Sequence, residues 1–297
     1  MAGSAVVTGG LVQVDGQWHL HPDLQPWRST LLRRRQRWFD AELHNPLSLL
    51  AAVVRVAAAQ LLVRDADGAQ YWVVTPWHGQ AVRDRVRLLP SSLFAWNRRD
   101  ADWLRSLLQP LLVDLEMELL VLSGGALVMR CAHPLAVDPL PYPLLEANGL
   151  TNRHPDGEDG GRLMRLLSEV QMLLHQQHSP HRGDQHAIHG IWLWGGWQSA
   201  QPVRELSLPR IACRDRHLRH ICDGRDPQWW IGGAEEMVEM LPYGDSLPAI
   251  VVLTGGGRAV LFAGRRWNPF ANRGLHEDAL TGGEALLWQQ LRGRDAL

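Results

Sequence analysis

The clearest indication of the fold class lies in residues 188–196, Ile188-His189-Gly190-Ile191-Trp192-Leu193-Trp194-Gly195-Gly196. A near-continuous apolar run that ends in two glycines is typical of a strand covered on both faces, as the strands of a parallel sheet are. A helix is predicted just before it, because leucine and valine recur at three- and four-residue spacing from Leu163 to Leu174. A helix followed by a buried strand indicates an α/β fold.

The same alternation continues toward the C-terminus. Apolar strands are predicted at Ile211–Cys213, Ala249–Leu253 and Arg258–Ala263, and helices at Asp215–Cys222, at 234–241 and around Trp288. We therefore expect the C-terminal half to be a mostly parallel sheet with flanking helices.

The N-terminal half has a mixed α+β pattern. Residues 1–45 are mainly polar and irregular, and Arg33, Arg34, Arg35 and Arg37 are interpreted as the solvated face of a helix, with single-stranded nucleic acid binding as the alternative. The remaining predictions are a hairpin at Asp15-Gly16, a helix over 46–62, strands at Tyr71–Thr75 and 82–89, a helix from Asp100 to Glu118 kinked at Pro110, and a hairpin through Gly124-Gly125.

A domain boundary is predicted where prolines cluster and the chain then becomes polar. Pro134, Pro139, Pro141 and Pro143 precede the polar, glycine-containing segment Asn152–Gly161. The predicted division is an N-terminal α+β region at 1–150, a linker or exposed loop at 151–161, and a C-terminal α/β region at 162–297.

The composition excludes several classes of function. The 297 residues contain no lysine, so all 30 cationic side chains are arginine. Schiff-base and pyridoxal-phosphate enzymes, P-loop nucleotidases and kinases are thereby excluded, because their chemistry needs a lysine. The net charge of -1 provides no global field for nucleic acid or for an anionic membrane.

The cysteine content and the apolar runs indicate a cytoplasmic protein. Three cysteines in a chain of this length do not make a disulfide framework, and no signal peptide is visible at residues 1–10. The longest apolar run, Leu47–Val63, contains Arg55 and Gln60 and is short for a membrane span. We expect no membrane association, and the oligomeric state stays open.

A ligand pocket is predicted around the 188–196 strand. Ser168, Gln171 and His175 share one helix face, because they lie three and four residues apart. In open α/β sheets, ligands bind at the carboxyl ends of the strands. The polar stripe of the helix, a histidine-rich loop with His178, and the turn at Gly195-Gly196 beside His189 are therefore expected to line one pocket. The alternative is a solvent-facing stripe beside a turn that needs backbone freedom.

The helix, loop and strand together resemble a proteobacterial family labelled phosphoglycerate-mutase-like, or RpfE-like regulatory protein. The family pattern is similar to S-E-x-Q-M-L-L-H, a His-Pro loop and N-S-x-W-x-W-G-G-G, which match residues 168–175 and 189–197. A T-P-x-H segment matches residues 75–78, and the resemblance covers about residues 60–265. It departs from the pattern at His178-Ser179-Pro180, at His189 in place of asparagine, and at Trp197 in place of the third glycine. The resemblance adds four candidate ligand-binding residues to the pocket: Glu169, Trp194, Thr75 and His78.

The resemblance implies distant kinship with cofactor-independent phosphoglycerate mutases and their alkaline-phosphatase-like fold. Such enzymes use a Ser or Thr nucleophile beside two divalent metals that Asp and His residues hold. We recognise no such ligand set, and Leu253 is followed by Thr254 and three glycines where a metal-binding aspartate is expected. The interpretation is a non-catalytic regulatory or ligand-binding protein. The alternatives are a metal-dependent phosphatase or mutase, and a protein-interaction module that uses exposed tryptophan and arginine.

Two clusters have the residue types of a metal site. The first contains His175, His178, His181, His186 and His189, and the second contains Cys213, His217, His220 and Cys222. Polar surface explains the first, and buried cysteines beside surface histidines explain the second, which lacks a Cys-x₂-Cys pair. We predict no catalytic residue, no metal and no cofactor, with a divalent metal as the alternative. The partner is expected to be a small molecule or a protein.

Overall fold

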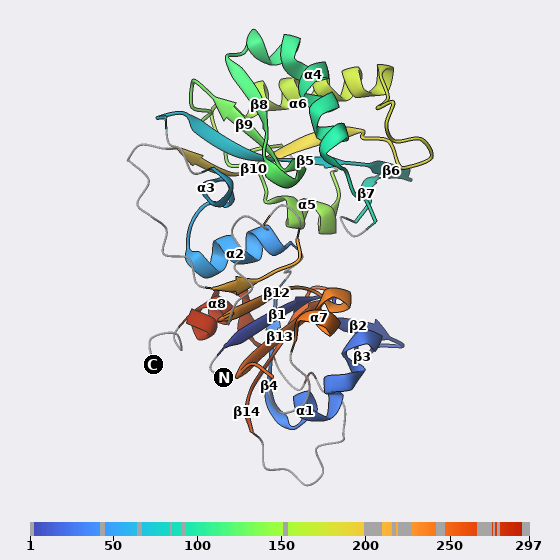
Figure 1. Cartoon of the computed structure of the whole chain (residues 1–297), viewed down its shortest axis with the longest axis vertical. Coiled ribbons are helices and arrows are strands. Elements are labelled where there is room, and N and C mark those ends of the chain that lie inside the picture. Colours follow the sequence, from blue (N-terminus) through green and yellow to red (C-terminus); the bar gives the residue numbers. More distant parts are fainter. Residues whose placement is uncertain are drawn as a thin grey trace. The chain divides into compact units, whose positions relative to one another are not determined.

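The computed structural model describes residues 3–41, 45–63, 67–83, 85–90, 93–150, 154–198, 210–215, 218, 227–241, 247–265, 275, 277 and 280–292. It divides the chain into two compact units (Figure 1). Unit 1 combines Met1–Arg55 with Ser207–Leu297, and unit 2 is the inserted segment Val56–Leu206.

This division differs from the predicted boundary at 151–161. The described part of that segment belongs to unit 2, where Asp156 forms a β-bridge with Asp138. The first boundary instead falls within the predicted 46–62 helix. Helix α2 (Pro46–Val54) ends at Arg55, whose φ of 60° is left-handed, and α3 (Ala58–Leu62) is a separate helix. Arg55 therefore breaks the helix without the glycine or proline that would have marked the position in the sequence.

Unit 1 contains a large, mostly parallel sheet, as predicted for the C-terminal half. β1 pairs in parallel with both β12 and β13, whereas β14 is antiparallel to β13 and β4. The N-terminal residues predicted to be irregular supply two of these strands, so both ends of the chain build the sheet. Its strands, in spatial order, are β11 (Ile211–Ala212), β12 (Trp229–Gly233), β1 (Ser4–Thr8), β13 (Ile250–Gly255), β14 (Arg258–Arg265), β4 (Arg34–Asp40) and β15 (Leu280–Gly283).

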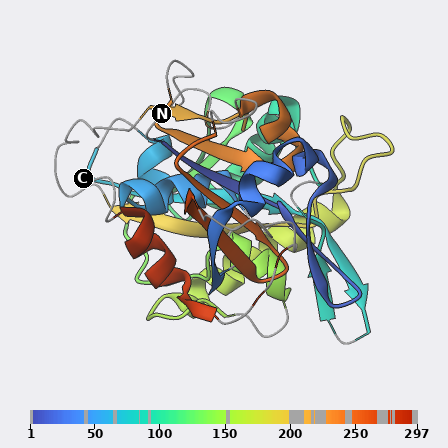
Figure 2. The ribbon, with the colours of Figure 1, turned by 90° about the horizontal axis from the view of Figure 1, so that it is seen from below.

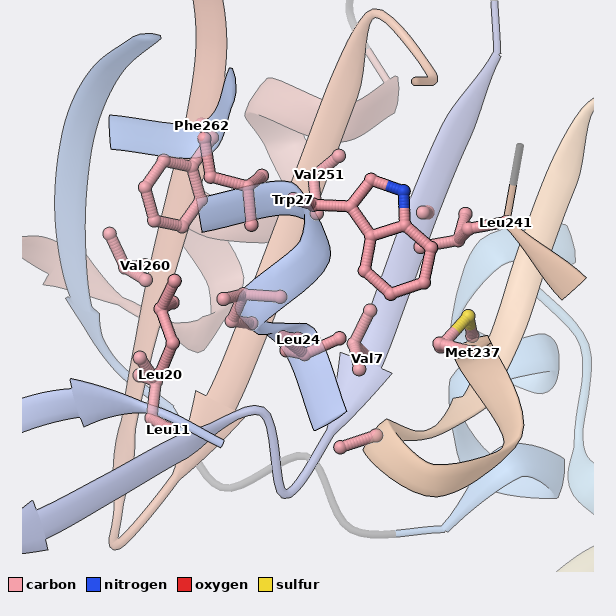
Figure 3. Close-up of a cluster of buried hydrophobic side chains, with 14 of the residues drawn as sticks. Val7, Leu11, Leu20, Leu24, Trp27, Met237, Leu241, Val251, Val260 and Phe262 are labelled. Carbon is pink, nitrogen blue, oxygen red and sulfur yellow. The ribbon is translucent and has the colours of Figure 1, made fainter. Parts of the chain in front are cut away.

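Helices pack on this sheet and close its core. The 3-10 helix η1 (Pro22–Trp27), α1 (Arg28–Leu32) and α7 (Ala234–Met240) cover the face that presents Val7 and Val251, and Trp27 and Met237 are buried there (Figure 3). α2 contacts β12, and α8 (Glu284–Arg292) contacts β4 and β15, with α2 and α8 side by side (Figure 2). Each large apolar side chain buried in this way contributes about 1.5–3 kcal/mol to folding.

The arginine-rich segment forms a strand, so the prediction of a solvated helix face was wrong. β4 alternates, with Arg35 and Arg37 exposed and Gln36 half-buried, before Trp38 and Phe39 enter the core. Pairing with β14 stabilises the extended form of this segment. Side chains of a strand alternate between its two faces, so these arginines do not form the single face that a helix would present. The predicted hairpin at Asp15-Gly16 is confirmed: β2 (Leu11–Val14) pairs with β3 (Gln17–Leu20), and both turn residues have positive φ.

Unit 2 is an antiparallel sheet between helices. Its strands, in spatial order, are β10 (Gly190–Gln198), β5 (Gln70–Trp77), β9 (Leu127–Cys131) and β8 (Met117–Val121). Figure 1 shows α4 (Arg98–Val113) and α6 (Gly160–Gln176) above this sheet, and α3 and α5 (Tyr142–Asn148) below it. β6 (Gly79–Val82) and β7 (Arg85–Leu88) form a separate hairpin after β5.

The strand that gives the clearest indication of the fold class is therefore antiparallel, contrary to the prediction of a parallel strand. β10 pairs with β5, from Gly190 opposite Trp77 to Gln198 opposite Gln70. Ile191–Trp194 are all buried because α6 and α3 both pack on β10, so the apolar run reports burial on two faces and not strand direction. The strand also continues past Gly195-Gly196 through a β-bulge, where we expected it to end.

Most other predicted elements are confirmed within the described residues. The long helix is α4, which contains Pro110 and ends at Val113, and β8 and β9 form the hairpin around Gly124-Gly125. The 82–89 strand falls on the β6–β7 hairpin, and most of the Asp215–Cys222 helix lies outside the described residues. In the part of the chain that the structure describes, no helix combines the length and apolar character needed to cross a membrane.

The tryptophan side chains that the structure describes mostly belong to the core, so these residues do not form a surface of exposed tryptophans. Ten of the tryptophans in the described residues are buried, and Trp96, Trp103 and Trp197 are half-buried. Trp267 lies outside the described residues.

Candidate histidine site

Four of the predicted pocket residues have structural roles on β5 and β10. The indole Nε1 of Trp194 donates a hydrogen bond of 2.8 Å to the hydroxyl of Thr75, and both side chains are buried. A Cβ on Gly196 would lie 2.5 Å from the ring of Trp72, and one on Gly195 would lie 2.6 Å from Ala58. Gly195 also has a φ of 59°. These glycines allow α3 and Trp72 to approach the bulged strand.

The predicted pocket does not form as a single site. Gly195 lies six residues beyond His189 in one extended segment, which separates them by about 20 Å at 3.3 Å per residue. Because β5 runs antiparallel to β10, His78 lies beside His189 at one end of the strand pair, while Thr75 and Trp194 lie further along. The strand pair therefore separates the histidines from the glycine turn.

Three histidines do come together at this end of unit 2. The ring of His78 lies 4.2 Å from the ring of His189 and 4.8 Å from that of His186, measured between centroids. We call His78, His186 and His189 the histidine cluster. The chain segments are joined by hydrogen bonds from the backbone N–H of His189 to the carbonyl of Trp77, 2.8 Å, and between His78 Nδ1 and the carbonyl of Ala187, 2.9 Å.

The predicted residues on and after α6 divide into two groups. His175 and His178 are exposed, and their charges act on His189. Glu169 is half-buried and Gln171 is exposed on α6, and neither forms a hydrogen bond with the histidine cluster among the residues that the structure describes. Of the sequence-predicted site, His78, His175, His178 and His189 therefore gather in one region.

The surroundings of His189 disfavour a positive charge on its ring. His189 is exposed at the surface but partly desolvated by its neighbours, and this desolvation lowers its pKa below the ordinary value. The neighbouring charge of His78 lowers the pKa further, with smaller contributions from His178 and His175. A hydrogen bond with the backbone of Gly79 acts in the opposite direction. His189 consequently takes up a proton only in more acidic solution than an isolated histidine, unless a negative charge comes close.

A buried ion pair fixes the loop that carries His186 and His189 of the cluster. We call residues 177–189 the histidine loop. Arg182, 6% exposed, places its Nη1 3.0 Å from Oδ2 of Asp100, which is fully buried. Its other nitrogens donate to the backbone carbonyls of His186, 2.6 Å, and Ala95, 3.0 Å. The guanidinium also lies 4.9 Å above the ring of Phe94, which stacks on His78 at 6.3 Å.

Asp100 joins the histidine loop to the start of α4. Its Oδ2 accepts a hydrogen bond from the backbone N–H of Asn97, 3.1 Å, in a reciprocal capping box, and its Oδ1 accepts one from the hydroxyl of Ser179, 3.1 Å. Sequence reasoning missed both Asp100 and Arg182 as parts of the site. Asp100 has the pattern of an ordinary helix start, and no local signal connects it with an arginine 82 residues later.

The described residues contain no group of three or more His, Cys, Asp or Glu side chains with the geometry to hold a metal ion. In the second sequence cluster, Cys213 is described, whereas His217, His220 and Cys222 lie outside the described residues. In the histidine cluster, the ring of His78 contacts the rings of His186 and His189, and imidazole rings can form hydrogen bonds and change charge.

In unit 1, the β2–β3 hairpin lies against the carboxyl end of β13. A Cβ on Gly255 would lie 2.1 Å from the carbonyl oxygen of Leu11, and one on Gly256 would lie 3.1 Å from the ring of Trp18. The hairpin is held there because the indole of Trp18 donates to Glu277, 2.8 Å, which also pairs with Arg258, 2.7 Å. The glycines after Thr254 therefore give room to this chain's own hairpin.

Comparison with known proteins shows distant structural similarity to solved structures. No family model matches the chain, and no curated protein matches it. Among solved structures, the chain is similar to the cofactor-independent phosphoglycerate mutase from Thermoplasma acidophilum DSM 1728, with 11% sequence identity and a TM-score of 0.36, over 98% of this chain and 100% of that one.

Proposed function

We propose that this protein is a non-catalytic, ligand-binding regulatory protein, and that the histidine cluster of unit 2 is its ligand site. The observation that carries the proposal is the contact of His78 with His186 and His189 on a loop that a buried ion pair fixes. Imidazole nitrogens that are held in place can bind a ligand without first being ordered, which lowers the entropic cost of binding. The kinship with RpfE-like regulatory proteins and the alkaline-phosphatase-like topology belong to the same proposal.

The roles of the other predicted residues support this choice of site. Thr75 satisfies the indole of Trp194 inside the core, and Gly195 and Gly196 accommodate neighbouring side chains. These residues pack against their neighbours inside unit 2, whereas His186 and His189 are exposed and His78 is half-buried. A solute can therefore reach the histidines but not the Thr75–Trp194 pair.

Histidine-detected NMR of the full chain tests the proposal. We expect at least one of three probes, inorganic phosphate, acetate or Zn²⁺, to shift the ring signals of His78 and His189 saturably, and the shift to be lost in His78→Asn and His189→Asn. His133→Asn is the matched control, because His133 is an exposed histidine of unit 2 that pairs with Glu116. Binding that survives both cluster variants would contradict the assignment of the site.

The competing function is metal-dependent phosphoryl transfer by a phosphatase or mutase. Phosphatase and mutase assays with Mn²⁺ or Zn²⁺ separate the two functions. We expect no turnover above the buffer rate. Turnover that a chelator abolishes and the metal restores would replace the non-catalytic proposal.

A further inference from the structure

We propose that the histidine cluster binds a small oxyanion, and that it does so together with a proton taken up by His189. This inference deepens the proposed function and rests on it, since it names the class of ligand for the same site. It follows from the hydrogen bonds that each ring nitrogen already makes and from the charges around the rings.

His189 can gain a proton without moving. Its Nδ1 lies 3.2 Å from the backbone N–H of Gly79 and 3.0 Å from the carbonyl oxygen of the same residue. An unprotonated Nδ1 accepts from that N–H, and a protonated Nδ1 donates to that carbonyl. Gly79 therefore provides a hydrogen-bond partner for both the protonated and the unprotonated Nδ1. Nε2 carries a hydrogen that can be donated to a ligand in two cases: when the neutral ring has an unprotonated Nδ1, and when the ring is cationic.

His78 provides a second nitrogen for the ligand. Its Nδ1 faces the carbonyl oxygen of Ala187 at 2.9 Å, and because a carbonyl can only accept, Nδ1 carries the hydrogen. The Nε2 of a neutral His78 is then an acceptor, and it becomes a donor only when the ring is protonated. Protonation of His189 adds a positive charge to the cluster, and it adds an Nε2–H donor where the neutral ring carries its hydrogen on Nδ1. A positive charge and an N–H donor are what bind carboxylate and phosphate oxygens.

The surroundings supply positive charge and leave the negative charge to the ligand. His175 of α6 and His178 of the histidine loop both act on His189 electrostatically. Arg182 of the loop and Asp100 of α4 neutralise each other in their buried pair. Asp184 is an exposed acid of the same loop, and it is the residue of the loop that would supply the negative charge in place of a ligand. A bound oxyanion would offset the repulsion among the histidines and raise the pKa of His189 toward or above its ordinary value.

A titration of the full chain at constant ionic strength tests this coupling. We expect inorganic phosphate to raise the apparent pKa of His189, followed by its ring NMR signals, and the dissociation constant of phosphate to rise about tenfold per pH unit once His189 has lost its proton, as linkage to one proton requires. Between the free and the phosphate-bound pKa of His189, calorimetry in buffers of different ionisation enthalpy should give uptake of about one proton per phosphate, after the ionisation of phosphate itself is subtracted.

Variants separate this coupling from general charge effects. His189→Asn keeps a polar atom near Gly79 but cannot be protonated, so we expect phosphate binding to weaken at least tenfold at pH 6 and to lose its pH dependence. His133→Asn should bind phosphate as the parent chain does. Asp184→Asn should leave the proton uptake unchanged, whereas its loss in that variant would make Asp184 the counterion and overturn the proposal.

The outcomes also separate this inference from the proposed function. Binding of phosphate or acetate without proton uptake overturns the coupling and leaves the ligand site standing. Saturable binding of Zn²⁺ at the cluster without binding of either anion overturns the oxyanion assignment and likewise leaves the site standing. If none of the three probes reaches the cluster, both proposals fail.

Discussion

The carboxylate of Asp100 and the guanidinium of Arg182 form an ion pair 3.0 Å long, with their side chains 0% and 5% exposed. The two residues are 82 positions apart, and their pair connects the capping box of α4 with the histidine loop. Asp100 also accepts hydrogen bonds from Asn97 and Ser179, and Arg182 also donates to two backbone carbonyls, so each polar side-chain atom of the pair has a partner.

We predict that Arg182→Met strongly destabilises unit 2. It removes the cation and leaves the carboxylate of Asp100 buried, which costs about 3–5 kcal/mol of unfolding free energy. Chemical denaturation followed by far-UV circular dichroism measures the loss. The control is Arg98→Ala in the exposed pair with Asp102, where about 1 kcal/mol or less is expected. Equal losses in the two variants would mean that the buried pair has no special role.

Gly196→Ala tests the packing role of the glycines in β10. The new Cβ would lie 2.5 Å from the ring of Trp72, so we expect a loss of about 1–3 kcal/mol from overpacking. Gly161→Ala is the matched control, since nothing lies within 4 Å of its Cβ position and it is in the first turn of α6. That variant should gain up to about 1 kcal/mol. A ligand role for Gly196 would instead appear as lost binding at unchanged stability.

Thr75→Val removes the hydroxyl that accepts from Trp194 Nε1 at nearly constant volume. The buried indole N–H then has no acceptor, and we expect a cost of about 1–3 kcal/mol. Thr75→Ser keeps the acceptor and should lose less stability than Thr75→Val. Thermal or urea unfolding of the two variants makes the comparison, and a larger loss in Thr75→Ser would show that the methyl group matters more than the hydrogen bond.

The lowered pKa of His189 predicts how stability changes in mild acid. The unfolded chain takes up this proton near the ordinary value of 6.5, before the folded chain does. The contribution of His189 to stability is therefore complete above about pH 6.5 and decreases as the pH falls toward the folded-state pKa. His189→Asn should flatten this part of the curve of unfolding free energy against pH, and His133→Asn should not.

The lowered pKa of Asp67 predicts a second loss of stability at lower pH. The backbone N–H of Ala69, the hydroxyl of Tyr71 and the guanidinium of Arg130 lower the pKa of this carboxyl to about 2, from an ordinary 3.8. Stability from the ionised form is complete above the ordinary value and disappears as the pH falls to about 2. In Asp67→Asn this pH dependence should be absent, so the stabilities of variant and parent should converge near pH 2.

The local elements of this fold could be predicted better than their assembly. The periodicity of α6, the turn at Asp15-Gly16 and the apolar runs of β13 and β14 are signals contained in a few neighbouring residues, and these elements are confirmed. The direction of β10 and the place of β1 in the centre of a sheet depend on partners far along the chain. An apolar run records that both of its faces are buried, and nothing in it records which strand lies beside it.

The site could be predicted in part for the same reason. The density of histidines between His175 and His189 is visible in the sequence, and His78 came from the resemblance of its T-P-x-H segment. That His78 contacts His189 follows from the antiparallel pairing of β5 and β10, which the sequence did not indicate. The contribution of Arg182 depends on Asp100 being buried, a property of the packed loop and not of either residue.

The insertion of unit 2 within unit 1 has a consequence for synthesis on the ribosome. β1 pairs with β12 and β13, so Ser4 cannot pair with Trp229 and Ile250 until those residues have been synthesised. At about 5–20 residues per second, this delay is roughly 10–50 s. Unit 2 is continuous in sequence and can complete its contacts meanwhile, whereas the apolar residues Ala5, Val6 and Val7 stay without their partner strands. During this interval the nascent apolar residues of β1 are exposed and open to non-native contacts.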